Sequence, residues 1–342
     1  MEKSENNTQN MMPQIPSVEE AYKFFKIELN PDGSLTRHAE APTLPASPEP
    51  DPNNPNSSLS KDIPLNAATG TFIRLFRPRS PPPNAKLPLL IYYHGGGFVF
   101  LSATSAPFHA SCGRMSAHLP ALIASVEYRL APEHRLPAAY HDAIDAVEWA
   151  RDQAAAGAAA ADPWMGELAD FSRVFLMGSS AGGNIVYRTG LTLLDRDVRP
   201  MKIVGLIMNQ PFFGGVRRTG SELAYYNDKI IPLHGADLLW SLALPEGAGR
   251  DHEYCDPLAG GGPGEERLRR LPLILVRGYS GDPLVDKQKE FVEMLAARGA
   301  RVVAQFVDGG FHGVELFDPK FADALYDAIR DFVAADDRDR GN

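Results

Sequence analysis

A serine enclosed by small residues stands at the centre of the segment FLMGSSAGGNIVY, residues 175–187. The segment matches the G-x-S-x-G pattern, in which a strand turns sharply into a helix and the central serine is exposed at the turn. Only residues with little or no side chain fit beside such a turn. Ser180 is therefore the candidate nucleophile, although these small residues alone would equally suit an ordinary glycine-rich turn.

A serine nucleophile needs a base, and the base needs a carboxylate that orients it. Three histidines follow Ser180 in the chain, and only His312, in VDGGFHGVELF, comes directly after an apolar run. Asp282 follows the preceding apolar run, in LPLILVRGYSGDPLVD. Asp286 is a competitor for the acid, but it falls within the next helical pattern, so we assign the acid to Asp282.

Backbone donors for a developing negative charge are the third requirement of acyl transfer. The N–H group of Ala181 supplies one donor, and the segment YYHGGGFVF supplies the others through Gly95, Gly96 and Gly97. Which two of these three glycines donate stays open. His94 precedes the serine in the chain, so we expect it to brace this loop rather than to transfer protons.

Apolar runs and helical patterns alternate along the chain, which is typical of an α/β fold: an open, mostly parallel sheet with helices on both faces. Seven apolar runs predict strands, at 71–78, 87–94, 121–128, 173–178, 202–210, 271–278 and 301–308. Helical patterns fall between or after them, at 108–118, 138–153, 183–194, 285–298 and 321–334. Each candidate catalytic residue follows a strand, where enzymes of this class place their sites.

The predicted division of the chain is a tail, a single domain and a second tail, at residues 1–16, 17–336 and 337–342. Ser17 is expected to cap a short helix. Residues 214–270 interrupt the alternation, so we expect them to form a cap over the site together with residues of about 17–60. Aromatic side chains of these segments and of strand ends are candidate pocket residues, chiefly Phe98, Phe212, Tyr225 and Trp240, and with them Phe100, Phe213 and Tyr226.

Charge and cysteine content narrow the function classes. The 34 lysines and arginines against 43 aspartates and glutamates give a net charge of -9, which removes the electrostatic case for nucleic-acid binding. The two cysteines cannot build a disulfide framework, and the N-terminus lacks the apolar core of a signal peptide. These features predict a cytoplasmic protein without a membrane span, acting on a small molecule as a monomer or weak homodimer.

One segment, RDHEYCDP, gathers potential metal ligands in His252, Glu253, Cys255 and Asp256. A single cysteine among mixed oxygen ligands suits no common metal site. We therefore expect neither a metal nor any other cofactor.

The motifs HGGGF, YRLAPEH, GSSAGGN, GDPLVD and GGFHG together resemble those of the plant class I carboxylesterases, in the hormone-sensitive-lipase branch of the α/β-hydrolases. The resemblance runs from about residue 16 to residue 333. It implies the α/β-hydrolase fold, a triad of Ser180, Asp282 and His312, and hydrolysis of small to medium, largely neutral esters. One departure is Ser179, where elbows of the family often carry an acidic residue; we expect it to affect only local packing and charge.

Two other functions occur on the same scaffold. Some relatives act as dehydratases, lyases or cyclases, which use the basic histidine and the oxyanion hole for elimination. Gibberellin receptors resemble hydrolases that have lost the triad histidine and altered the glycine loop. The complete set of Ser180, Asp282 and His312 favours an acyl-enzyme esterase, with the elimination enzyme as the main alternative.

Overall fold

The computed structural model describes residues 16–50 and 58–340, apart from the side chains of 336–340. The predicted N-terminal tail lies outside the described residues except for Pro16. At the other end the last helix, α10 (Pro319–Arg340), continues through most of the segment predicted as a tail. The sequence DDRDR has no apolar periodicity to mark this helical turn, so the helical pattern predicted from the sequence ended earlier, at residue 334.

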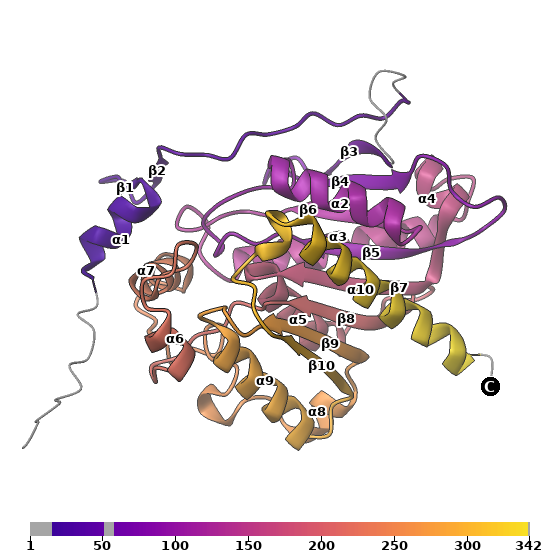
Figure 1. Ribbon diagram of the computed structural model, residues 1–342. Coiled ribbons are helices and arrows are strands. Elements are labelled where there is room, and N and C mark those ends of the chain that lie inside the picture. The colour runs from indigo at the N-terminus through magenta and orange to yellow at the C-terminus, as the bar shows by residue number, and fades with distance from the viewer. Residues whose placement is uncertain (1–15, 51–57, 341–342) are drawn as a thin grey trace, which may run out of the picture.

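An eight-stranded sheet forms the centre of the molecule, in the order β10-β9-β8-β7-β5-β6-β4-β3 (Figure 1). Every pairing in this sheet is parallel except the two that β4 makes, with β3 and with β6. The bounds are β3 (Ser58–Asn66), β4 (Thr71–Pro78), β5 (Leu87–Tyr93), β6 (Leu122–Glu127), β7 (Ala169–Ser179), β8 (Ile203–Asn209), β9 (Leu273–Tyr279) and β10 (Val302–Val307). The predicted fold class and all seven predicted strands are confirmed.

The one strand of this eight-stranded sheet that the sequence did not predict is β3, at its edge. Its residues SLSKDIPLN are largely polar, and the register shifts between Pro64 and Asn66. An edge strand tolerates proline and needs only one buried face, so it does not present the continuous apolar run that marks the central strands.

Helices bury both faces of the sheet. Successive side chains of β5 point to opposite faces, so that Leu89 and Ile91 join one apolar cluster while Leu90 and Tyr92 join the other. The first cluster includes residues of α3 (Ala138–Ala156), α5 (Ala181–Leu193) and α9 (Val285–Ala297). The second includes residues of α2 (Ala106–His118) and α10, which lie in front of the sheet in Figure 1.

Elements from two distant parts of the sequence lie together beyond the sheet, at the left of Figure 1. They are α1 (Val18–Phe25), the hairpin of β1 (Ile27–Leu29) and β2 (Leu35–Arg37), α6 (Gly220–Ala224) and α7 (Leu233–Ala243). Helix α1 begins with the expected cap, because Ser17 and Glu20 form a capping box, and it packs against α7.

Arg37 fastens the hairpin to the body of the protein. Its guanidinium donates hydrogen bonds to the carbonyls of Val99, at 2.8 Å, and Ala131, at 2.9 Å, and it pairs with Glu133. The remaining helices are α4 (Pro163–Leu168), α8 (Glu265–Arg269), and the short η1 (Ala259–Gly261) and η2 (Val314–Leu316).

Candidate active site

The turn between β7 and α5 explains why Ser180 has small neighbours. Ser180 has φ 55° and ψ -119°, an uncommon conformation for a residue with a side chain. A Cβ atom at Gly178 would lie 2.2 Å from the carbonyl carbon of Gly182, and one at Gly182 would lie 1.9 Å from the carbonyl oxygen of Tyr93. Both positions therefore require glycine, and the turn projects the serine at the carboxyl end of the sheet.

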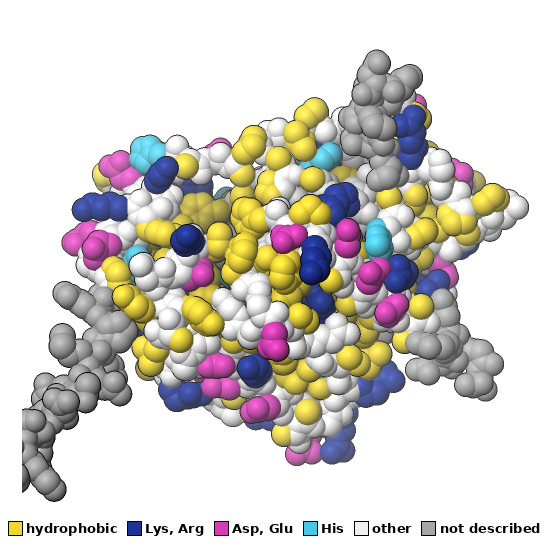
Figure 2. Space-filling model, in the orientation of Figure 1, with side chains coloured by type: hydrophobic (Ala, Val, Ile, Leu, Met, Phe, Trp, Pro, Cys, Tyr) yellow, Lys and Arg dark blue, Asp and Glu magenta, His cyan; other side chains and the backbone are white. Residues whose placement is uncertain are grey.

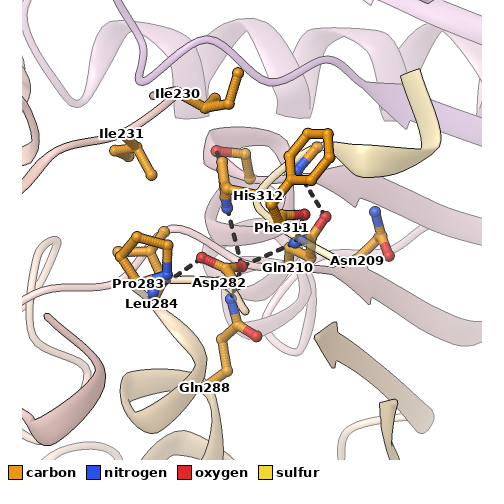
Figure 3. A network of polar contacts seen from close by, with 12 residues as sticks. Asn209, Gln210, Ile230, Ile231, Asp282, Pro283, Leu284, Gln288, Phe311 and His312 are labelled. Atoms are coloured by element: carbon orange, nitrogen blue, oxygen red, sulfur yellow. Dashed lines mark hydrogen bonds and ion pairs between the residues drawn. The ribbon is translucent and has the colours of Figure 1, made fainter. Parts of the chain in front are cut away.

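The structure brings Ser180, His312 and Asp282 together from three separate loops. The Nε2 atom of His312 lies 2.9 Å from Ser180 Oγ. Its Nδ1 atom lies 3.0 Å from Asp282 Oδ2 (Figure 3). A carboxylate only accepts hydrogen bonds, so Nδ1 of the neutral ring carries the proton and Nε2 accepts from the serine hydroxyl. This geometry suits removal of the serine proton by histidine.

Asp282 is fully buried and has further partners that the sequence analysis did not identify. Its Oδ2 atom accepts hydrogen bonds from Nε2 of Gln210, at 2.9 Å, and Nε2 of Gln288, at 3.0 Å, while Oδ1 accepts from the N–H of Leu284. Gln210 also accepts a hydrogen bond from the Gly313 N–H and donates one to the Phe311 carbonyl. It thus holds the acid and both flanks of His312, although it follows β8, after which no catalytic residue was expected.

These contacts set the charges of the pair. Burial by itself would raise the pKa of Asp282, but the positive charge that His312 can carry and the hydrogen bonds to the carboxylate hold that pKa below its usual value. Burial by itself would lower the pKa of His312, but the nearby Asp282 carboxylate outweighs it and raises the pKa above the usual value. Asp282 is therefore ionised at neutral pH and favours the imidazolium that forms when His312 takes a proton.

Asp286 and His94, which the sequence analysis did not assign to the triad, make structural contacts instead. Asp286 accepts a hydrogen bond from the Ser221 N–H at 2.8 Å and thereby joins α9 to α6. His94 is buried, with its ring stacked on that of Tyr128 and Nδ1 2.7 Å from the Gly95 carbonyl oxygen. Burial lowers the pKa of His94 to about 4, so it is neutral and braces the glycine loop.

The glycine loop that follows β5 lies next to Ser180. Among the turn and loop hydrogen bonds of residues 16–50 and 58–340, none is donated by the backbone N–H group of Gly95, Gly96 or Gly97. A Cβ atom at Gly95 would lie 3.1 Å from Ser180 Cβ, so this loop passes directly beside the nucleophile. The loop predicted to supply oxyanion donors therefore lies at the serine.

A cavity of about 510 Å³ opens onto Ser180 and His312. Figure 2 shows hydrophobic side chains gathered around a hollow between the α1 and α7 region and the body of the molecule. In Figure 3, Ile230 and Ile231 lie across from His312. The apolar side chains that line the cavity include Phe25, Phe100, Leu101, Phe108, Ile230, Ile231, Leu239, Leu316 and Phe317.

The aromatic residues selected from the sequence are, apart from Phe100, not those of the cavity wall. Phe98, Phe212 and Trp240 are buried against one another, with the rings of Phe212 and Trp240 stacked at 4.5 Å. Tyr225 is 41% exposed and also lies outside the cavity lining found in the described chain. The prediction failed because an apolar side chain at a strand end has the same pattern whether it packs in the core or faces a pocket.

A larger hollow of about 780 Å³ lies away from the serine, between α5 and residues 251–267. Its three arginines face carboxylates, in the pairs Arg188–Glu253, Arg196–Glu148 and Arg267–Asp195. Because these charges compensate one another, this hollow does not present an unpaired cation to an anionic ligand.

Side chains of the segment RDHEYCDP make contacts within the protein. Glu253 pairs with Arg188, and Nδ1 of His252 accepts a hydrogen bond from the Tyr254 N–H. Across the described residues, no three His, Cys, Asp or Glu side chains converge as metal ligands would. In the same part of the chain no helix is both long and apolar enough to cross a membrane.

Comparison with known proteins places the chain in a family. Residues 90–316 match a family described as having the alpha/beta hydrolase fold. The chain is 51% identical over 321 residues to a probable carboxylesterase 8 of Arabidopsis thaliana, and the match covers 93% of this chain and 94% of the relative. It is 44% identical over 290 residues to a 3-O-acetylpapaveroxine carboxylesterase of Papaver somniferum, covering 83% of this chain and 93% of the relative.

Solved structures agree with this placement. An esterase of Pyrobaculum calidifontis has a TM-score of 0.65 at 27% sequence identity, and the match covers 80% of this chain and 85% of the esterase chain. An ester hydrolase from the metagenome of Lake Arreo has a TM-score of 0.68 at 25% sequence identity, and the match covers 84% of this chain and 85% of the hydrolase chain. The resemblance found in the sequence motifs is thus confirmed: the chain belongs to the alpha/beta hydrolase fold family and, within it, to the plant carboxylesterases.

Proposed function

We propose that this protein hydrolyses carboxylic esters through an acyl-enzyme formed on Ser180. The observation that carries the proposal is the position of His312, whose two ring nitrogens lie 2.9 Å from Ser180 Oγ and 3.0 Å from Asp282 Oδ2. The N–H groups of the glycine loop beside the serine, which donate none of the turn and loop hydrogen bonds of the described residues, support it further.

The acylation step follows from these contacts. Ser180 Oγ attacks the ester carbonyl carbon while His312 Nε2 takes the hydroxyl proton, and the carbonyl oxygen becomes an oxyanion. Ala181 and two of Gly95, Gly96 and Gly97 donate hydrogen bonds to that oxygen. The imidazolium then returns its proton to the leaving alkoxide as the carbon–oxygen bond breaks, which releases the alcohol.

Deacylation repeats the sequence with water as the nucleophile. His312 takes a proton from water as it attacks the acyl-enzyme carbonyl, and gives that proton to Ser180 Oγ as the acid leaves. Asp282 keeps the Nδ1–H tautomer and stabilises the imidazolium in both steps.

The cavity favours a neutral ester with apolar groups. Apart from His312, the ionisable residues that line its described part are Glu40, which is exposed, and Glu315, which is buried. Neither offers a positive charge to an anionic substrate. Because a relative bears the name of an acetyl-ester esterase, we infer that short acyl esters of larger, uncharged alcohols are substrates.

The test is the pre-steady-state release of p-nitrophenol from p-nitrophenyl acetate. An acyl-enzyme predicts a burst of about one equivalent in the wild-type protein and none in Ser180→Ala. An organophosphate should label Ser180 alone, as mapped by mass spectrometry. An adduct on Ser179, or a Ser180→Ala variant that still converts a metabolite by elimination, would replace this mechanism with that of a lyase or cyclase.

We further propose a cytoplasmic monomer or weak homodimer. The two cysteines, Cys112 and Cys255, are both buried thiols without a disulfide, which suits a reducing compartment.

A further inference from the structure

A second group of polar side chains borders the cavity beneath the nucleophile turn. Asn209 Nδ2 donates a hydrogen bond of 2.6 Å to Glu315 Oε1 and one of 3.4 Å to Ser179 Oγ. Tyr92 Oη also donates to Ser179 Oγ, at 3.4 Å. Ser179, Asn209 and Glu315 are called the polar niche below.

The niche has hydrogen-bonding capacity that the described residues leave unused. Among them Glu315 Oε2 and Asn209 Oδ1 are buried without any partner. Ser179 Oγ already accepts two hydrogen bonds, so its own hydrogen remains free to donate. Buried polar atoms without partners are uncommon and costly, so the niche has unused hydrogen-bonding capacity for a water or for a group of the substrate.

The niche opens toward the substrate side of the site. Ser179 precedes the nucleophile and Glu315 follows His312 by three residues, and both line the cavity. Glu315 is only 4% exposed. Apolar residues also line this cavity, among them Phe108 of α2 and Leu316 of η2. A substrate group that enters the cavity here can meet the Ser179 hydroxyl, whose hydrogen is free to donate, and the Glu315 carboxyl.

The surroundings of Glu315 act on the pKa of its carboxyl in opposite directions, with a net upward shift. Burial raises the pKa of Glu315 above the usual value, although a hydrogen bond to its own backbone and the proximity of His312 partly offset this. Arg277 of β9 also acts on this carboxyl, but its guanidinium is bound to Gln305 and Tyr279. Glu315 Oε2, which has no partner among the described residues, accepts a hydrogen bond when the carboxyl is ionised and donates one when it is neutral.

We propose that the polar niche is a specificity site, which binds a hydrogen-bond-accepting oxygen of the substrate close to the scissile ester. The enzyme then prefers esters that carry an ether, hydroxyl or carbonyl oxygen near the reacting carbon over hydrocarbon esters of the same shape. This inference rests on the proposed esterase function.

Two pairs of matched esters test it. p-Nitrophenyl methoxyacetate and p-nitrophenyl butyrate differ in the acyl chain by one oxygen in place of a methylene, and 2-methoxyethyl acetate and butyl acetate differ in the same way in the alcohol. For each pair the ratio of kcat/KM is measured in wild type and variants. Comparing the ratio between enzymes cancels the different intrinsic reactivities of the esters.

Glu315→Met removes the carboxyl while keeping a similar length. It should reduce the preference for the oxygen-bearing ester in one of the pairs by about 2- to 13-fold, the range of one neutral hydrogen bond. Glu315→Gln keeps a donor and should retain most of the preference. Leu316→Ala, from the same short helix, should change the rates of both members of a pair together and leave the ratio unaltered. The responding pair tells whether the acyl or the alcohol group occupies the niche.

Ser179→Ala provides an independent variant should Glu315→Met fail to fold. It removes the free hydroxyl and should lower the same ratio. Active enzymes whose ratios stay at the wild-type value in both pairs would overturn the specificity site and leave the esterase intact. A wild-type protein that hydrolyses none of the four esters would instead overturn the proposed function, and the specificity site with it.

Discussion

Replacing Gln210 by methionine tests whether its contacts position His312. Gln210 Nε2 lies 2.9 Å from Asp282 Oδ2 and 3.0 Å from the Phe311 carbonyl oxygen, and Gln210 Oε1 accepts from the Gly313 N–H at 2.9 Å. Methionine is close to glutamine in size but can make none of these hydrogen bonds. The substitution therefore weakens the support of the carboxylate and of the turn that carries His312.

Gln288→Met is the matched control. Gln288 Nε2 donates to the same Asp282 oxygen at 3.0 Å, but from α9 and without a hydrogen bond to the turn at His312. Each variant loses one hydrogen bond to a charged group, worth about 1.5 to 3 kcal/mol. Only Gln210→Met also leaves the Gly313 N–H without its partner, which costs about 1 to 3 kcal/mol more.

The expected result is a difference between the two variants. Gln210→Met should lower the free energy of unfolding by about 1 to 3 kcal/mol more than Gln288→Met does, as measured by urea denaturation. It should also lower kcat for p-nitrophenyl acetate by about 10- to 100-fold, because a small displacement of the base is costly. Equal losses of kcat in the two variants, or a Gln210→Met enzyme as fast as wild type, would refute a positioning role for Gln210.

Three other outcomes are expected. Asp282→Asn should lower kcat about 10,000-fold, since the amide can favour the wrong tautomer of His312, and a drop below tenfold would argue against the acid assigned here. Activity should be lost as the pH falls through a pKa above the usual ~6.5 of histidine, because Asp282 raises the pKa of His312 and only the neutral ring is a base; a pH–rate profile with its acid limb well below 6 would contradict this. Gly182→Ala should cost more than about 3 kcal/mol of stability or prevent folding, because the new Cβ atom would lie 1.9 Å from the Tyr93 carbonyl oxygen, whereas Gly264→Ala, with nothing within 4 Å, should melt near the wild-type temperature.

Much of the fold could be predicted because its signals are local. Central strands are buried on both faces, so each appears as a continuous apolar run, and the alternation with helical patterns indicates a parallel sheet. Several elements escaped this reasoning, including β1, β2 and α4. The edge strand β3 buries its residues unevenly, and the last turns of α10 are too polar to show a periodic pattern.

The candidate catalytic residues were also accessible from the sequence. Ser180, Asp282 and His312 each follow a strand, and the carboxyl ends of parallel strands meet at one edge of the sheet. Ser180 and His312 are 132 residues apart in the chain, but they could still be predicted to lie close together, because each follows a strand of the same sheet.

Only the tertiary structure decided which side chains surround the reacting groups. Gln210 and Gln288 bind the acid from different elements, and nothing in their local sequence distinguishes them from other glutamines. Phe98 and Trp240 pack in the core while Phe100 lines the cavity, although all three are aromatic residues of the predicted regions. Position along a strand or helix follows from local periodicity, whereas the choice between core and cavity depends on the packing of segments distant in the chain. The sequence by itself therefore determined the central strands of the sheet, the order of the candidate catalytic residues along the chain and the chemistry that these residues suit. The packing of α1, α7 and the loops determined the shape of the cavity in which that chemistry takes place.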